Sequence, residues 1–277
     1  MGEKALMNKK KIVLELRQLC RHFGGLKAVH EVDLVLEEDA LNGLIGPNGS
    51  GKTTMFNVIT GIYEPTFGDV LFEGEKISGL EPHVINQMGI ARTFQNIRLF
   101  PDLTVLDNVR IAYHTRAGYG MLDATMRTRN FAVKERELTE EAQEFLSVFN
   151  LQDRQTEIAK NLPYGEQRRL EIARALAANP KVLLLDEPAA GMNPNEVRTL
   201  MDLIYFIREK FNLTVLLIEH QMRVVMGICE HITVMDFGQV IARGSAKEVQ
   251  NDSKVIEAYL GPGIAELSKN YLKERKR

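Results

Sequence analysis

One short stretch restricts the possible folds of this chain more than any other. Residues 46–54 read GPNGSGKTT and lie between an apolar segment ending at Ile45 and a second one beginning at Met55. This pattern between a strand and a helix predicts a phosphate-binding loop, because glycines let successive backbone N–H groups approach an anion. The helix that follows directs its unpaired N–H groups and the positive end of its dipole at the same anion. The predicted phosphate-binding residues are Gly46, Pro47, Asn48, Gly49, Ser50, Gly51, Lys52, Thr53 and Thr54.

This loop predicts a site for a nucleoside triphosphate. Lys52 supplies a point charge for the β- and γ-phosphates, and the Thr53 hydroxyl is placed to bind Mg²⁺. The alternative is a glycine-rich turn that only begins a helix, which the complete motif and its flanks disfavour.

Two carboxylates follow a second apolar segment. The residues VLLL at 182–185 lead directly into Asp186 and Glu187. Open α/β sheets bind ligands at the carboxyl ends of their strands, so both side chains belong near the phosphate loop. Asp186 suits a Mg²⁺ ion, and Glu187, facing the other way, suits a base for an attacking water. A strand ending in two acids is common by itself, and the pairing with the loop makes the prediction specific.

Composition excludes several classes of protein. A formal net charge of −2 over 277 residues gives no basic surface for nucleic acid, so no nucleic-acid partner is expected. Cys20 and Cys229 lie far apart without metal-type spacing, and no apolar run approaches the roughly 20 residues that span a bilayer. The lysine-rich stretch from Met1 to Lys11 has no apolar region after it, so no signal peptide is expected.

The order of the remaining segments predicts an α/β sheet with a helical insertion. Apolar spacing predicts helices at 104–114, 136–149, 166–178, 194–211 and 253–260, with a polar, aperiodic stretch at 115–130. Predicted strands cover 12–16, 32–37, 69–72, 90–94, 181–185, 214–218, 232–235 and 240–242, with a polar loop at 21–25. Alternating strands and helices favour a mostly parallel sheet with a small antiparallel β layer.

Four further stretches and Phe23 complete a family pattern. The residues LPYGEQRR at 162–169 are separated by one short helix from the strand that ends at Asp186. Gln95 and His220 each follow a predicted strand, and the residues GMN occupy 191–193. With the phosphate loop, Phe23 and Glu187, this order resembles the nucleotide-binding subunits of ABC transporters from about Ile12 to Leu260.

The resemblance implies a P-loop NTPase (RecA-like) core at 12–95 and 163–244, a helical subdomain at 96–162, and an ATPase domain that ends near 261 before a charged tail at 262–277. It implies that two subunits pair head to tail with ATP between them. Glu187, His220 and Gln95 are then catalytic, Gln95 joins Thr53 and Asp186 around Mg²⁺, and Phe23 and Val29 contact ATP. The signature residues facing the partner's ATP are Leu162, Pro163, Tyr164, Gly165 and Glu166.

Several of these residues also have ordinary structural explanations. Gln95 and His220 also fit ordinary solvated positions at the ends of strands. Phe23 is equally compatible with a place in the core, and Asn193 with a role as a helix cap and nothing more. Three positions depart from the family pattern: Pro163 replaces serine, Glu166 replaces glutamine, and Asn193 replaces aspartate. These departures suggest pairing with a different ATPase subunit and weak ATP hydrolysis by the purified chain.

Stretches at 24–29, 91–96, 99–105, 164–174, 188–193 and 255–261 resemble branched-chain amino acid importers, and the extra segment at 115–130 is similar to the larger ATPase subunit of those systems. The resemblance implies two membrane permeases, a periplasmic or extracellular solute-binding protein as an indirect partner, and a peripheral position on the cytoplasmic face of the inner (plasma) membrane. The alternatives are a urea or amide importer, a lipopolysaccharide exporter, or a soluble ABC ATPase. A P-loop GTPase or small-molecule kinase is disfavoured, because no guanine-reading motif follows the loop.

Overall fold

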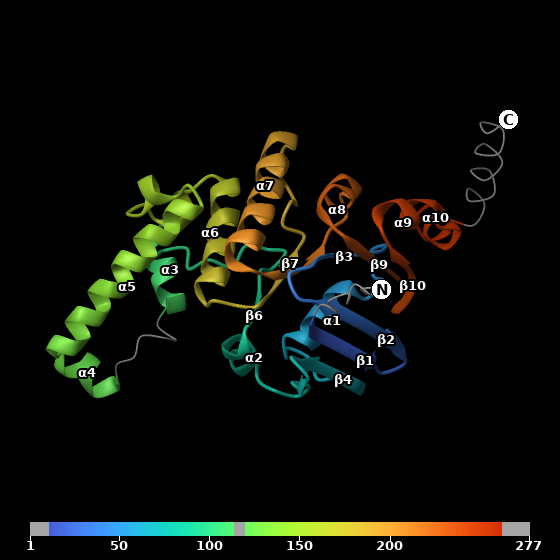
Figure 1. The fold of residues 1–277 in the computed structure, drawn as a ribbon, viewed down its shortest axis with the longest axis horizontal. Coiled ribbons are helices and arrows are strands. Elements are labelled where there is room, and N and C mark those ends of the chain that lie inside the picture. The colour runs from blue at the N-terminus through green and yellow to red at the C-terminus, as the bar shows by residue number, and fades with distance from the viewer. Residues whose placement is uncertain (1–10, 114–119, 262–277) are drawn as a thin grey trace, which may run out of the picture.

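The computed structural model describes residues 11–113 and 120–261, and its centre is a mainly parallel sheet (Figure 1). Strand order across this sheet is β10 (Gln239–Gly244), β9 (His231–Asp236), β3 (Leu41–Ile45), β8 (Thr214–Ile218), β7 (Val182–Asp186) and β6 (Ile90–Arg92). Only the edge strand β10 is antiparallel to its neighbour. Every residue of β3, β7 and β8 is buried, as expected for parallel strands covered on both faces.

Side chains along β7 alternate between two cores. Leu183 and Leu185 join a cluster built with α6 (Tyr164–Ala177), α7 (Pro194–Phe211) and α8 (Met222–Ile228). Val182 and Leu184 join the opposite cluster, which contains α1 (Lys52–Ile59) and the second sheet. Because successive side chains of a strand point to opposite faces, one apolar segment holds both layers together.

The second sheet is antiparallel, with strand order β2 (Leu26–Glu37), β1 (Ile12–Phe23), β4 (Phe67–Phe72) and β5 (Glu75–Lys76). The prediction of a loop from Arg21 to Gly25 was wrong, since β1 continues to Phe23 and only Gly24 and Gly25 form the turn. Register irregularities along the β1–β2 pair interrupt the alternation of apolar and polar residues, which hid the second half of β1 and the first half of β2 from the sequence analysis.

The helices of the core largely agree with the apolar spacing. The predicted cap of α7 is confirmed, because Asn193 and Glu196 form a capping box with a proline in the first turn. The helix predicted at 253–260 is α10 (Ser253–Leu260). Two short helices that were not predicted are α2 (Pro82–Met88) and α9 (Ala246–Asn251).

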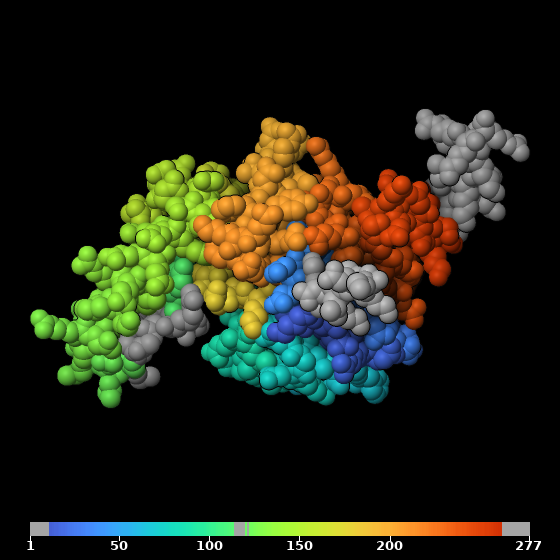
Figure 2. Space-filling view, viewed as in Figure 1, coloured from blue at the N-terminus to red at the C-terminus, as the bar shows by residue number. Residues whose placement is uncertain are grey.

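A group of helices extends from one end of the sheet (Figures 1 and 2). It contains α3 (Val105–Tyr113), α4 (Met121–Met126) and α5 (Arg129–Val148), followed by 3₁₀ turns at Gln152–Arg154 and Ala159–Asn161. Helix α5 begins seven residues before the predicted start at Arg136, because Thr128 caps it by accepting the N–H of Phe131. Residues 114–119 and the tail at 262–277 lie outside the described residues, and no described helix is long and apolar enough to cross a bilayer.

Candidate nucleotide-binding site

The phosphate loop connects the end of β3 to the start of α1. Gly46 and Gly51 have φ angles of 152° and 103°, where L-residues with side chains are rarely found. A β-carbon on Gly46 would lie 2.0 Å from the Met235 carbonyl oxygen, and one on Gly51 would lie 2.1 Å from that of Ala28. Both positions therefore require glycine, and the loop closes tightly onto the sheet.

Lys52, the first residue of α1, lies at the centre of this loop. Its ammonium donates to the carbonyl oxygens of Gly46 and Pro47 at 2.8 and 2.9 Å and to the Ser50 hydroxyl at 3.3 Å. Burial lowers the pKa of Lys52, and the carboxylates of Glu187 and Asp186 oppose this shift. The Lys52 ammonium is thus held by neutral oxygens of the loop. Phosphate oxygens, which are negatively charged, can replace these oxygens as its hydrogen-bond acceptors.

Asp186 ends β7 with its side chain almost completely buried. One carboxylate oxygen, Oδ2, accepts from the Arg92 guanidinium at 2.7 Å, while the other, Oδ1, is buried without a hydrogen-bond partner in the described part of the chain. Burial raises the pKa of Asp186, and Arg92 opposes the rise. The buried oxygen Oδ1 belongs to a carboxylate that interacts electrostatically with Lys52, and such an oxygen fits a Mg²⁺ ion, which prefers oxygen ligands. Asp186 itself is not among the residues that line the cavity beside the loop.

Glu187 is held between two polar side chains. Its Oε2 accepts from Gln95 Nε2 at 2.9 Å, and its Oε1 lies 2.6 Å from His220 Nε2. Its backbone has a φ of 47°, an uncommon conformation for a residue with a side chain and one often found at functional sites. The structure therefore brings together Glu187, Gln95 and His220, which come from three separate segments of the sequence.

A cavity of about 560 Å³ joins this acidic group to the loop. Its lining includes the predicted residues Phe23, Asn48, Gly49, Gly51, Lys52, Thr53, Thr54, Gln95, Glu187 and His220. Phe23 is 39% exposed, packs edge to face on Tyr63 with ring centroids 5.3 Å apart, and has the Arg21 guanidinium over its ring. Val29 is different: it is fully buried in the core and does not line the cavity.

Sequence reasoning missed other residues around this site. Leu26, Lys27, Ala28, Phe237 and Gly238 also line the cavity, the last two from the hairpin between β9 and β10. Glu219 is buried and accepts the N–H groups of Ala189, His220 and Gln221, so it fixes the backbone beside His220 and Glu187. The sequence shows that an acid precedes His220, but it does not show that the Glu219 side chain points into the protein.

The signature residues lie apart from the cavity, at the start of α6. Leu162 is buried as an anchor, whereas Pro163 and Tyr164 are exposed, and Tyr164 and Gly165 form the first turn of the helix. Glu166 pairs with Arg154 and Arg169 at 3.4 and 3.6 Å. Its charge is thus partly compensated within the chain.

One buried ion pair connects the signature helix to the segment carrying Gln95. Arg168 is completely buried, donates to the carbonyl oxygens of Phe94 and Gln95 at 2.7 and 2.8 Å, and pairs with Glu171 at 2.7 Å. Glu171 in turn accepts the Arg98 N–H at 3.0 Å. The backbone around Gln95 is therefore clamped to α6.

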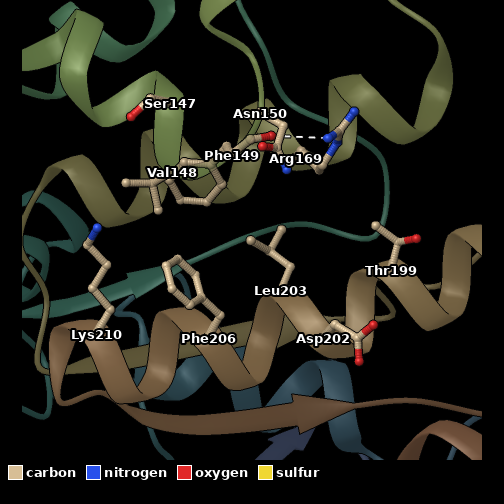
Figure 3. A pocket seen from close by; sticks show the side chains of 10 residues that line it. All are labelled: Ser147, Val148, Phe149, Asn150, Arg169, Thr199, Asp202, Leu203, Phe206 and Lys210. Atoms are coloured by element: carbon tan, nitrogen blue, oxygen red, sulfur yellow. Dashed lines mark hydrogen bonds between the residues drawn. The ribbon is translucent and has the colours of Figure 1, made fainter.

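A second hollow, of about 470 Å³, lies between α5 and α7 (Figure 3). Val148, Leu203 and Phe206 form its apolar middle, and Arg169 donates to the Phe149 carbonyl oxygen at 3.1 Å on one side. No phosphate-loop residue lines it. The chemistry of a nucleotide therefore belongs to the cavity of the phosphate loop.

Comparison with known proteins assigns the family. The ABC transporter family model matches residues 29–190, and a model for branched-chain amino acid ATP-binding cassette transporters matches residues 239–261. The chain therefore belongs to the ABC transporter family as one of its ATP-binding cassettes, a class of ATPases. It is 45% identical over 249 residues to the high-affinity branched-chain amino acid transport ATP-binding protein BraF of Pseudomonas aeruginosa, covering 90% of this chain and 98% of BraF.

Solved structures agree on the fold. The ADP conformation of MJ1267, an ATP-binding cassette of an ABC transporter, superposes with a TM-score of 0.78 at 34% identity, covering 91% of this chain and 99% of that one. A dimeric cassette, MJ0796 bound to ADP and Pi, gives a TM-score of 0.71 at 26% identity over 84% of this chain and 98% of that one. The α/β fold of a P-loop NTPase with an antiparallel β layer is thereby confirmed.

Proposed function

We propose that this chain is the ATP-hydrolysing subunit of an importer for branched-chain amino acids. ATP hydrolysis is supported above all by the position of the Glu187 carboxylate. Gln95 and His220 hold it in the cavity that the phosphate loop lines. A carboxylate fixed in this way can orient a water and accept its proton. The family match at 239–261 supports the solute class.

Each residue of the cavity has a distinct task in this proposal. The loop N–H groups and Lys52 bind the β- and γ-phosphates, and Phe23 stacks on the base. Glu187 accepts the proton of the attacking water, while His220 and Gln95 fix the direction of its carboxylate. Thr53, Gln95 and Asp186 would hold a Mg²⁺ ion, whose positive charge would offset the negative charge of the phosphates.

The exposed signature supports a dimer. Pro163 and Tyr164 lie outside the chain's own cavity, so a second cassette must bring its equivalents to the ATP bound here. The dimeric MJ0796 cassette supports such pairing. The partner is a second copy or a related ATPase subunit, and ATP closes the interface until the γ-phosphate leaves.

The proposal also assigns partners and location. The dimer attaches to two permeases that span the membrane, with a solute-binding protein on the other side, and so lies peripherally on the cytoplasmic face of the inner membrane. The match at 239–261 favours this assignment over a lipopolysaccharide exporter, a urea or amide importer, or an ABC ATPase without a transport role.

Purification of the chain from membranes with its bound partners tests the solute. We expect two permeases to co-purify, and we expect vesicles containing this complex to take up leucine, isoleucine and valine when ATP is present on the cassette side. Uptake of urea alone, or recovery of a lipopolysaccharide permease, would contradict the assignment. A catalytically inactive Glu187→Gln complex is the matched control for ATP dependence.

A further inference from the structure

Three metal-ligating side chains meet outside the nucleotide cavity. Cys20 and His22 come from β1 and His30 from β2, and one ligand atom from each lies within 4.8 Å of the others. Cys20 Sγ and His30 Nδ1 are 3.9 Å apart. The cluster takes no part in the proposed nucleotide chemistry.

A β-bulge produces this arrangement. Leu19 pairs with Val32 and Arg21 with Val29, so two residues of β2, His30 and Glu31, face the single residue Cys20 of β1. Glu31 has a φ of 52°, which marks the bend. Bulges redirect side chains, and Cys20 and His22 share one face of β1 because they are two residues apart.

The environment of the sulfur suits a metal-bound thiolate. Cys20 is 4% exposed, and its Sγ accepts the backbone N–H of Glu31 at 3.1 Å. An N–H donor stabilises negative charge on sulfur, which is the form that binds metals. Cys20 is also a free cysteine, since no disulfide involves it.

His22 supplies an independent observation. Its Nε2 is buried and has no hydrogen-bond partner among residues 11–113 and 120–261. Buried polar atoms are nearly always satisfied, so a ring nitrogen of this kind indicates a missing ligand such as an ion. His22 is only partly buried as a residue, which leaves a route for an ion to enter.

The outer side of His30 carries both a carboxylate and an ammonium. Its Nε2 lies 4.0 Å from Glu31 Oε1 and 3.3 Å from Lys27 Nζ. When Nδ1 binds a metal, Nε2 carries the proton and donates to a carboxylate, an arrangement common behind metal-bound histidines. Lys27 is exposed on a flexible stem and can turn into solvent, leaving Glu31 as the partner.

We propose that Cys20, His22 and His30 bind a zinc-class divalent ion, with a fourth position open to water. One thiolate and two imidazoles are typical zinc ligands, and binding releases the thiol proton of Cys20 to solvent. Tetrahedral zinc places sulfur and nitrogen ligands about 3.3–3.6 Å apart. The 3.9 Å between Cys20 Sγ and His30 Nδ1 is close to this range, and one ligand atom of His22 lies within 4.8 Å of both residues' ligand atoms.

Cobalt titration of the full-length chain, free of nucleotide and of any histidine tag, tests the site. Nucleotide is omitted because its phosphates also bind divalent ions. We expect one Co²⁺ per chain, with the visible bands of tetrahedral cobalt and a thiolate-to-cobalt charge-transfer band that Zn²⁺ abolishes by displacement. The absence of a charge-transfer band in the wild-type chain overturns the proposal.

Matched variants identify the ligands. Cys20→Ser removes the charge-transfer band, whereas Cys229→Ser, which changes the other buried free cysteine, retains it. His22→Gln and His30→Gln each weaken Co²⁺ binding at least about 10-fold, whereas His231→Gln, at an exposed histidine of the other sheet, does not. Binding by His22→Gln and His30→Gln as tight as that of the wild type also overturns the proposal, and circular dichroism confirms that each variant is folded.

Discussion

The phosphate-loop cavity is formed by this chain alone, whereas the signature segment faces outward and, in the proposed dimer, needs a neighbouring chain to form an ATP site. On the phosphate-loop side, Lys52 and Asp186 are 5% and 1% exposed, and each has a polar partner within the chain. In the signature segment, Tyr164 is 44% exposed and Pro163 is exposed beside it. One wall of an ATP site is thus preformed, whereas the other is presented outward for a neighbour.

This difference has a physical origin. The cavity lies where buried parallel strands end, and its most buried cation, Lys52, is held by hydrogen bonds within the chain. The signature lies at the start of a helix, where unpaired N–H groups can remain in water until a phosphate replaces it. Arg168 joins the two regions, since it clamps the backbone at Gln95 to the signature helix.

The largest expected effect comes from removing the charge of Glu187. Glu187→Gln should lower steady-state ATP turnover by about 10²–10⁴-fold, because the side chain can no longer accept a proton. ATP should still bind and hold a closed dimer, which size-exclusion chromatography detects. Glu166→Gln, which changes an acid of the signature segment, should not lower turnover. Equal turnover in wild type and Glu187→Gln removes Glu187 from the catalytic role.

Breaking the link between the two regions should mainly reduce stability. Arg168→Met leaves Glu171 buried without its cation, which should lower the free energy of unfolding by about 3–5 kcal/mol in urea titrations. The double variant Arg168→Met/Glu171→Leu should recover part of this loss. Arg169→Met, at a neighbouring arginine whose side chain is 22% exposed, should cost less than about 1 kcal/mol. A similar loss for both arginines would show that Arg168 is no special connection.

Lys52→Ala tests whether the phosphate-loop cavity binds ATP without a second subunit. Removing a charge-assisted hydrogen bond costs about 1.5–3 kcal/mol, so ATP affinity should fall roughly 10–150-fold. Protection of the isolated chain against heat unfolding by ATP measures this change. Tyr164→Ala should leave this protection unchanged, because Tyr164 does not line the chain's own cavity. If Tyr164→Ala reduces protection as much as Lys52→Ala, the proposed separation of the two walls is wrong.

The smallest effect is expected at the base-stacking residue. Phe23→Ala should weaken ATP binding by about 1–3 kcal/mol, as measured for bases that stack on aromatic side chains. Affinity for inorganic triphosphate should not change, since it has no base to stack. Phe67→Ala, at an exposed phenylalanine of the same sheet outside the cavity, serves as the control. Equal losses for ATP and triphosphate would contradict a stacking role.

The sequence by itself determined the elements with strong local signals. The loop at 46–54 requires a strand before it and a helix after it, and the structure has β3 and α1 at those places. The apolar runs before Asp186 and His220 form the buried strands β7 and β8, and the predicted cap at Asn193 is present. Local backbone chemistry and apolar periodicity suffice for such elements.

Only the tertiary structure decided how distant segments meet. The sequence does not show that Arg92 binds Asp186, that Arg168 reaches the Gln95 backbone, or that a bulge turns His30 toward Cys20. Each contact depends on sheet order, register or the direction of a buried side chain, which arise when separate segments pack together. The strand predicted to stop at Leu16 shows the same limit, because its bulges become interpretable only beside the paired strand β2.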